Sequence, residues 1–212
     1  MNVKQHTTHG RPGTEGARLD HVGLNEAITG AAFGGRRRRV YARIAALSGA
    51  RPADRVLDIG CGGGYLTRLL AAAVGPAGQV TGVDPAAGAV RHAQRRAPAN
   101  CSYLVGVAQD LDLPDRSFDV VTSTLATHHI PEAELAAAFS EMFRVLRPGG
   151  TLLAADFRPP ARRHTPHALA TRNRHGSAIP LEDLAAATRF RLDAHGELPL
   201  LRYIRATRPP AT

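Results

Sequence analysis

The sequence predicts a doubly wound α/β fold with a mostly parallel, seven-stranded sheet and an antiparallel C-terminal hairpin strand. Three observations support this prediction. Short apolar runs alternate with amphipathic helical patterns over residues 55–157, as in chains that build a parallel sheet covered by helices. A glycine-rich turn at residues 60–64 joins the first apolar run directly to a helical pattern. The tail ends in two further strand-like runs, which indicate a hairpin at the sheet edge.

The individual elements follow from the apolar periodicity and from glycine and proline punctuation. Parallel strands are expected at residues 55–59, 79–83, 101–105, 118–123 and 151–157. Helices are expected at residues 19–33, 36–48, 65–74, 86–96, 131–146 and 180–188. Pro131 suits the first turn of its helix, and Arg147-Pro148-Gly149-Gly150 ends it. The hairpin is expected to pair residues 190–194 with residues 200–206, with 195–199 as the connection.

The chain has 212 residues, which suits one α/β domain with a modest appendage. Residues 1–18 are polar and are expected to form a flexible tail, and residues 19–50 a helical lid. Residues 51–212 then form the ligand-binding domain, with 158–179 as a loop over its second substrate. No run of apolar residues is long enough for a membrane span, and the N-terminus does not have the pattern of a secretory signal.

The charge and the cysteines exclude several classes of function. Of 27 basic residues only Lys4 is a lysine, which argues against Schiff-base chemistry and against a Walker-type phosphate loop. The net charge of +9 is spread along the chain, and its one dense run, Arg36 to Arg39, is either a solvated surface or a functional patch. Cys61 and Cys101 do not form a disulfide framework, so a reducing, cytoplasmic location is expected.

The glycine turn carries the first functional signal. Its glycines are spaced G-x-G-x-G, and Tyr65 stands where the dinucleotide fingerprint has its third glycine. Asp58, two residues upstream, would repel a pyrophosphate and suits a ligand with a cationic amine. Asp84 ends the second strand, where a carboxylate can accept hydrogen bonds from both ribose hydroxyls. Together these residues favour a nucleoside that carries an amino acid and no phosphate, as in S-adenosylmethionine.

Residues 51–156 resemble the class I S-adenosylmethionine-dependent methyltransferases of the small-molecule type, which includes the ubiquinone and menaquinone C-methyltransferases. The matching segments are 56–67, 80–85, 108–121, 123–132 and 146–157. The resemblance implies a Rossmann-like fold, S-adenosylmethionine as the methyl donor, S-adenosylhomocysteine as its product and a small-molecule acceptor.

The resemblance also implies roles for single residues. The expected cofactor-binding residues are Asp58, Gly60, Cys61, Gly62 and Thr67 at the methionine part, Asp84 and Pro85 at the ribose, Val107 and Ala108 at the adenine, and Leu125 at the methionine end. Relatives often have Asp or Asn where Val107 stands, to bind the adenine amino group. Adenine would then rely on the Ala108 backbone N–H and apolar packing, or on Gln109 or Asp110, although Asp110 could equally cap a turn. Tyr41 is placed near the methionine carboxylate as a hypothesis.

Methyl transfer needs a base only if the acceptor atom must lose a proton. The candidates are His128, His129 and Asp156, which follow the fourth and fifth strands, and each could instead only line the site. Asp119, at the start of the fourth strand, and Cys61 as a thiol are expected to have no catalytic role. No metal site is expected.

Three other functions remain as alternatives. A non-catalytic, regulatory protein that binds S-adenosylmethionine fits the same motifs. A nucleic-acid methyltransferase is disfavoured because Ser123-Thr124-Leu125-Ala126 differs from the Asp/Asn-Pro-Pro-aromatic tetrad of amino-group methylation. A nicotinamide oxidoreductase is disfavoured by the glycine spacing. The basic segment 158–175 suits an acidic acceptor or a solvated loop. The sequence leaves open the acceptor, its O, N or C atom, and the oligomeric state.

Overall fold

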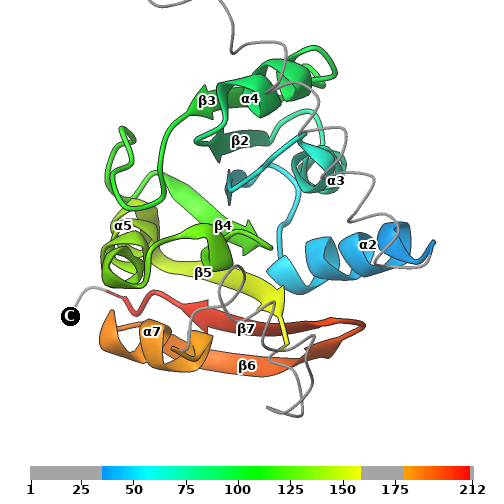
Figure 1. The fold of residues 1–212 in the computed structure, drawn as a ribbon. Coiled ribbons are helices and arrows are strands. Elements are labelled where there is room, and N and C mark those ends of the chain that lie inside the picture. Colours follow the sequence, from blue (N-terminus) through cyan, green and yellow to red (C-terminus); the bar gives the residue numbers. More distant parts are fainter. Residues whose placement is uncertain (1–34, 159–178, 211–212) are drawn as a thin grey trace, which may run out of the picture.

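A seven-stranded sheet forms the centre of the molecule in a computed structural model that describes residues 35–158 and 179–210. The strand order is β3-β2-β1-β4-β5-β7-β6, and helices cover both faces of the sheet (Figure 1). The doubly wound fold class is confirmed. The predicted tail 1–18, the predicted helix 19–33 and the predicted loop over residues 159–178 lie outside the described residues.

The first five strands are parallel and the last hairpin is antiparallel to them at β7. The strands are β1 (Arg55–Ile59), β2 (Gln79–Asp84), β3 (Cys101–Val105), β4 (Phe118–Thr124), β5 (Leu146–Phe157), β6 (Arg191–Leu198) and β7 (Leu201–Thr207). The carboxyl ends of β1, β2, β4 and β5 therefore meet along one edge of the sheet. Ligands bind at this edge in open α/β sheets.

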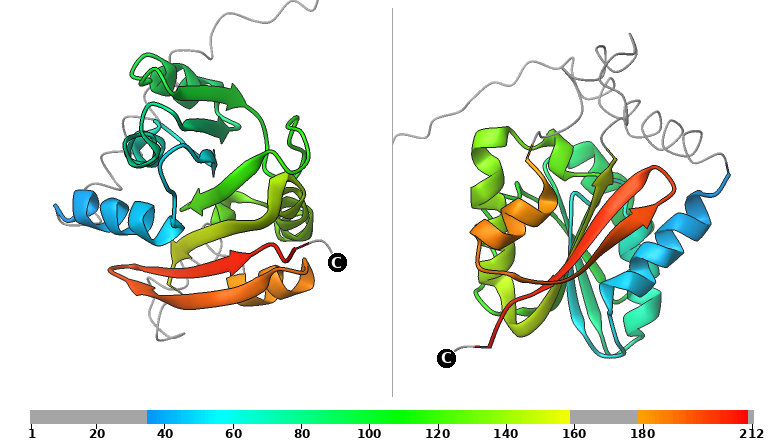
Figure 2. Two further views of the ribbon diagram at one scale, coloured as in Figure 1. Left: turned by 180° about the vertical axis from the view of Figure 1, so that it is seen from behind. Right: turned by 90° about the horizontal axis from the view of Figure 1, so that it is seen from below.

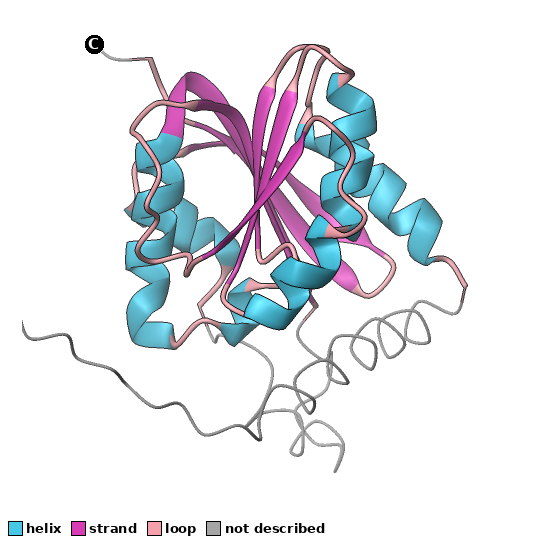
Figure 3. Cartoon of the chain, turned by 90° about the horizontal axis from the view of Figure 1, so that it is seen from above, coloured by secondary structure: helices cyan, strands magenta, loops and turns pink. Residues whose placement is uncertain are grey.

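The helices form two layers around the sheet, as the views from below and above show (Figures 2 and 3). One face carries α2 (Arg37–Ser48), α3 (Tyr65–Val74) and α4 (Ala87–Gln94), and the other carries α5 (Leu135–Val145) and α7 (Leu181–Ala187). Short 3₁₀ turns, η1 (Thr127–His129) and η2 (Glu132–Glu134), precede α5. Each face has its own apolar cluster, one around Phe139 and Met142 of α5 and one around Ile44 of α2 and Leu70 of α3.

Helix α2 packs directly on the sheet. Val40, Tyr41 and Ile44 are buried in one cluster with Val56 of β1 and Leu153 of β5. The buried face of α2, the first helix of the described residues, is therefore part of the core.

Two predicted boundaries were wrong. The helix predicted at residues 131–146 begins as the 3₁₀ turn η2, and α5 starts only at Leu135 because Pro131 has the extended backbone angles φ −53° and ψ 138°. It ends at Val145 because Leu146 is already in β5, where it pairs with Phe118. The predicted break at residues 147–150 is instead an irregular part of β5, at which the register with β4 shifts.

The connection predicted at residues 195–199 was also wrong. Strand β6 continues to Leu198, and only Pro199 and Leu200 join it to β7. The sequence pattern failed here because β6 is an edge strand with mostly exposed side chains, so it lacks an apolar run.

Candidate active site

The glycine turn after β1 is closed by hydrogen bonds within the protein. The N–H groups of Gly60 and Cys61 both donate to the carbonyl oxygen of Val83, at 2.8 Å and 3.1 Å, and Gly64 N–H donates to the Cys61 carbonyl at 2.9 Å. The N–H groups of these three residues are therefore not free to bind a ligand. A turn whose donors are already used is poorly suited to a phosphate group, which needs them free.

Asp84 joins the end of β2 to the glycine turn. Its Oδ2 accepts a hydrogen bond from Gly62 N–H at 2.8 Å, and its Oδ1 accepts one from Ala86 N–H at 2.9 Å. An ionised carboxylate offers about four acceptor positions, so each oxygen can accept a further hydrogen bond. The side chain therefore fixes the turn and can still accept hydrogen bonds from a ligand, with Pro85 as the next residue.

Asp58 lies below the turn and is almost fully buried. Thr67 donates its hydroxyl proton to Oδ2 at 2.7 Å, and Thr122 donates to Oδ1 at 2.8 Å. Burial raises the pKa of Asp58 to about 6, against the two hydroxyl hydrogen bonds, which lower it. At neutral pH the structure thus places a negative charge beneath the turn. Thr67, which was expected at the ligand, is itself buried and directs its hydroxyl to Asp58.

The loop after β3 carries the residues that were predicted from the sequence to contact adenine. Val107 is 37% exposed, whereas Ala108 and Leu111 are buried in the cluster under α5. Asp110 forms an isolated bridge with Val107, which agrees with its alternative role in a turn. Gln109 donates its side-chain amide to Glu134 of η2. Val107 therefore presents an apolar side chain here while its neighbours anchor the loop.

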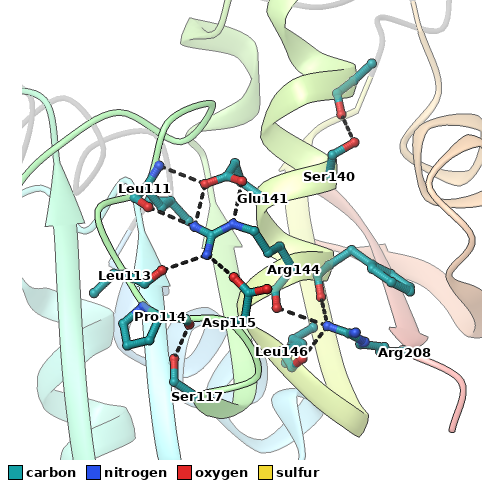
Figure 4. A network of polar contacts seen from close by, with 12 residues as sticks. Leu111, Leu113, Pro114, Asp115, Ser117, Ser140, Glu141, Arg144, Leu146 and Arg208 are labelled. Carbon is teal, nitrogen blue, oxygen red and sulfur yellow. Dashed lines mark hydrogen bonds and ion pairs between the residues drawn. The ribbon is translucent and has the colours of Figure 1, made fainter. Parts of the chain in front are cut away.

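Arg144 holds the remainder of this loop against α5 (Figure 4). Its guanidinium donates to the carbonyl oxygens of Leu111 and Leu113, at 2.8 Å and 2.7 Å, and forms ion pairs with Asp115 and Glu141. Glu141 also accepts the Leu111 N–H at 2.9 Å. The sequence analysis missed this pair. The spacing of Glu141 and Arg144, three residues apart on a helix, was a usable signal.

The chain leaves β4 through a strained residue. Leu125 has φ +56°, in the left-handed region that non-glycine residues rarely adopt, and its N–H donates to the Ala155 carbonyl at 2.8 Å. This bend brings Ala126 against the glycine turn, where a Cβ added to Gly60 would lie 2.2 Å from the Cβ of Ala126. The segment after β4 and the glycine turn are therefore packed together.

His128 and Asp156 form a buried pair at the carboxyl ends of β4 and β5. His128 Nδ1 lies 2.7 Å from Asp156 Oδ1, and both side chains are 7% exposed. Asp156 also accepts hydrogen bonds from the Thr127 hydroxyl and from the backbone N–H groups of His128 and Phe157. Burial alone would raise the pKa of Asp156, but the hydrogen bonds from His128 and Thr127 outweigh it and hold that pKa below its usual value.

The ionised carboxylate sets the role of each nitrogen in the His128 ring. A carboxylate only accepts, so Nδ1 is the donor to Asp156 and Nε2 carries the lone pair in the neutral ring. His129 is different, because it is exposed and stacks on His128 with ring centroids 4.0 Å apart. The structure therefore separates the two histidines that the sequence treated alike. Among the three candidate bases, it joins Asp156 to His128.

Comparisons with known proteins agree with this geometry. The profile of the family described as a methyltransferase domain matches residues 56–150. A demethylmenaquinone methyltransferase of Symbiobacterium thermophilum is 39% identical over 115 residues, which are 52% of this chain and 45% of that protein. The ubiquinone/menaquinone biosynthesis C-methyltransferase UbiE of Ectopseudomonas mendocina is 40% identical over 119 residues, 54% of this chain and 46% of that protein.

Residues 56–150 therefore match a methyltransferase-domain family, and the chain is similar to S-adenosylmethionine-dependent methyltransferases of the UbiE-like type. A solved methyltransferase from Aquifex aeolicus shares the fold, with a TM-score of 0.70 and 20% identity over 82% of this chain and 93% of that one. A second, from Methanosarcina mazei, has a TM-score of 0.61 and 25% identity over 74% of this chain and 93% of that one. The chain spans about half the length of the curated relatives it matches.

Three further features of the described residues have no part in the proposed chemistry. A hollow of about 560 Å³ lies at the opposite edge of the sheet, and its lining includes Gly75, Gln79 and Asn100. Asp119 accepts a hydrogen bond from Arg55 N–H and forms an ion pair with Arg147, and these contacts agree with a structural role. Burial raises the pKa of the Cys61 thiol, so the thiol stays protonated and is a poor nucleophile.

The described residues include neither a metal-binding cluster nor a helix that could span a membrane. Residues 35–158 and 179–210 hold no group of three or more His, Cys, Asp or Glu side chains placed to bind a metal ion. The same two ranges contain no helix long and apolar enough to cross a membrane.

Two tyrosines and an arginine gather beside the start of α3 in the methyltransferase domain. The Tyr41 and Tyr65 rings meet edge to face at 5.1 Å, and the Arg37 guanidinium lies 4.4 Å from the Tyr65 ring centre. Tyr41 is buried, and its pKa is raised mainly by that burial. Tyr65 directly follows the glycine turn, so the group lies beside that turn. Tyr41 was expected near the ligand, whereas Arg37 was singled out only as a member of the run Arg36 to Arg39.

Replacing Tyr41 with phenylalanine should weaken S-adenosylhomocysteine binding about tenfold to 100-fold, the effect of one lost hydrogen bond to a charged group. The free energy of unfolding should change little, because the phenylalanine ring keeps the packing against Tyr65. Isothermal titration calorimetry measures the affinity, with Tyr203→Phe on β7 as the matched control. An unchanged affinity in Tyr41→Phe would remove Tyr41 from the site.

Proposed function

We propose that this protein transfers the methyl group of S-adenosylmethionine to a small-molecule acceptor. The observation that carries the proposal is the buried His128–Asp156 pair, which the segment after β4 joins to the glycine turn. A protein that only bound the cofactor would not need a histidine oriented by a buried carboxylate next to it. The pair therefore favours an enzyme over the regulatory alternative.

The donor set of the site supports this cofactor. The glycine turn uses its own N–H groups internally, and Asp58 places a negative charge beneath it, so the site suits a cationic, phosphate-free ligand. Asp84 at the carboxyl end of β2 is available to accept the ribose hydroxyls. The proposed contacts at the adenine are Val107 and Ala108, through apolar packing and the Ala108 N–H. Leu125 would line the methionine end with its backbone.

In the proposed mechanism, His128 is the general base that takes the proton of the acceptor. S-adenosylmethionine, when bound, supplies a methyl group on a positive sulfur, and this sulfur keeps the electron pair of the bond that breaks. His128 Nε2 takes the proton from the acceptor atom, whose freed electron pair forms the bond to the methyl carbon. Asp156 keeps Nδ1 protonated and stabilises the positive ring that results. The glycine turn and the segment after β4 align the two reactants, which is the main requirement of an in-line displacement.

Relatives and composition refine the proposal. The names of two relatives describe methylation of demethylmenaquinone and a role in ubiquinone and menaquinone biosynthesis. Since the chain covers about half of those proteins, we infer only the broader class, an acceptor with a proton to lose. We further propose a cytoplasmic protein that does not act on nucleic acid. We also propose that residues 19–50 form a lid and that residues 158–179 cover the acceptor.

Calorimetry with S-adenosylhomocysteine tests the cofactor site. The wild-type protein should bind it, and Asp84→Ala should bind at least about 100-fold more weakly, because two ribose hydrogen bonds to a charged group are lost. Asp119→Ala is the matched control, since Asp119 also accepts a backbone N–H and lies at the start of β4, away from the site. Equal losses in the two variants would contradict the assigned role of Asp84.

Transfer of labelled methyl groups to a panel of hydroxylated and carbon-acid acceptors tests the reaction itself. Turnover with at least one acceptor supports the enzyme. Tight cofactor binding without turnover on any acceptor would instead favour the regulatory alternative. If neither S-adenosylmethionine nor S-adenosylhomocysteine bound, both the cofactor assignment and the proposed reaction would be wrong.

A further inference from the structure

Three charged residues stand side by side across the end of the sheet nearest to His128. In the antiparallel register, Arg202 of β7 lies opposite Asp156 of β5 on one side and opposite Glu197 of β6 on the other. Residues directly opposite in an antiparallel pair point to the same face, with Cβ atoms about 5 Å apart. The neighbouring pair Ala154 and Ile204 is buried in the cluster under α5, which identifies this face. Arg202 therefore leaves the sheet beside the carboxylate that orients the proposed base.

The two carboxylates of this row have partners other than Arg202. Asp156 accepts from His128, Thr127 and Phe157, and Glu197 forms an ion pair with Arg158 at 2.6 Å. The Nε atom of Arg202 is buried and has no hydrogen-bond partner among the described residues. Leaving a buried charged donor unpaired costs free energy, so such a donor needs a reason.

Arg205, on the same strand, also has an unpaired Nε among the described residues, but its surroundings explain its position. This Nε is buried as well, but Arg205 lies on the opposite face, in the middle of β7. A Cβ added to Gly49, just past the end of α2, would lie 3.1 Å from Arg205 Nη2, so this guanidinium packs at a helix C-terminus. Positive charge is favourable there. Arg202 instead lies at the carboxyl edge of the parallel strands, where the substrates of such sheets bind.

We propose that Arg202 binds an ionised oxygen of the acceptor, and that the substrate class of this enzyme is small molecules that carry a carboxylate or a similar anionic oxygen. The inference rests on the proposed function and adds the charge of the acceptor to it. A guanidinium presents a planar fork of donors that fits a carboxylate with two hydrogen bonds. Its place next to Asp156 sets the anionic group beside His128, so the atom to be methylated faces the base.

The probe is benzoate compared with its neutral isostere benzamide, added at equal ionic strength to protein saturated with S-adenosylhomocysteine. Calorimetry should show benzoate binding at least about tenfold more tightly than benzamide, as one charge-assisted pair predicts. Arg202→Met should abolish this preference, and Arg202→Lys should retain part of it. Arg205→Met, with the same kind of arginine removed from the other face, should keep the full preference.

The affinity for S-adenosylhomocysteine, measured first for every variant, distinguishes a failure of the proposed function from a failure of the Arg202 assignment. If the wild-type protein does not bind it, the proposed function fails. If all variants bind it but benzoate and benzamide bind equally, or if benzoate does not bind, the assignment of Arg202 is wrong. A preference for benzoate that survives in Arg202→Met would also overturn it.

Discussion

Replacing Asp156 with asparagine should slow methyl transfer by about 100-fold to 10,000-fold, the usual contribution of a positioned base. The asparagine amide cannot keep the His128 ring in its present state, because its N–H₂ group can donate to Nδ1 and so move the ring proton to Nε2. His128→Gln should cause a loss of similar size. Single-turnover assays with labelled S-adenosylmethionine and an acceptor identified by the panel measure the rate.

Cofactor affinity is the control for this prediction. Asp156 and His128 lie beyond the glycine turn and donate nothing to it, so S-adenosylhomocysteine affinity should stay within about threefold of wild type, below the effect of one lost hydrogen bond to a charge. His129→Gln should keep most of the rate, since that ring is exposed and lies outside the pair with Asp156. A rate that is unaffected in Asp156→Asn, or lost equally in His129→Gln, would contradict the base assignment.

Most of the fold could be predicted because short apolar runs mark its parallel strands, and several of these strands are also buried, as β1 and β4 are. The runs 55–59 and 101–105 and the helix 65–74 were predicted with the bounds that the structure has. Strand β6 was cut short because its exposed edge position removes the apolar pattern. The helix before β5 was predicted too long at both ends. A proline occurs both in the first turn of a helix and as an extended residue before it, so Pro131 did not fix the start. Leu146 is apolar and suits either a helix or a strand, and only its pairing with Phe118 places it in β5.

The site could be predicted only where a motif lies within one segment. The glycine turn and Asp84 follow from local spacing, and the structure places them in contact through Gly62. The His128–Asp156 pair spans two strand ends that are 28 residues apart. Neighbouring parallel strands would have suggested it, but only the structure distinguishes His128 from His129. Arg202 had no sequence signal at all, because its meaning depends on the register of the C-terminal hairpin.

The hydrogen bonds around Glu134 connect the two halves of the proposed site. Gln109 of the adenine loop bonds to Glu134, and the same short segment, residues 127–134, carries His128 at its start. Arg144 and Glu141 fix the other end of the loop to α5. One continuous stretch from η1 through α5 therefore supports both the proposed adenine loop and the proposed base. This arrangement explains why residues far from the chemistry, such as Glu141, belong to the site.

The glycine turn offers the second large effect, because two of its glycines are needed for different reasons. Gly60 has φ +71°, and an added Cβ would overlap the Cβ of Ala126 at 2.2 Å. Gly60→Ala should therefore lower the free energy of unfolding by about 2–5 kcal/mol, the sum of left-handed strain and overpacking. Gly62 has φ +51° with nothing within 4 Å of an added Cβ, so Gly62→Ala should cost only the strain, about 1–2 kcal/mol.

For cofactor binding we expect the opposite order, with the larger loss of affinity in Gly62→Ala. The open space at Gly62 lies next to the Asp84 carboxylate that its N–H binds, which is where the cofactor would approach the backbone. A methyl group there should weaken S-adenosylhomocysteine binding at least about tenfold in a protein that is still folded. Urea unfolding measures the stability of each variant, and calorimetry below the unfolding midpoint measures its affinity. If Gly62→Ala bound as tightly as wild type, the cofactor would have to approach the turn from a side other than the one that Asp84 and Gly62 define.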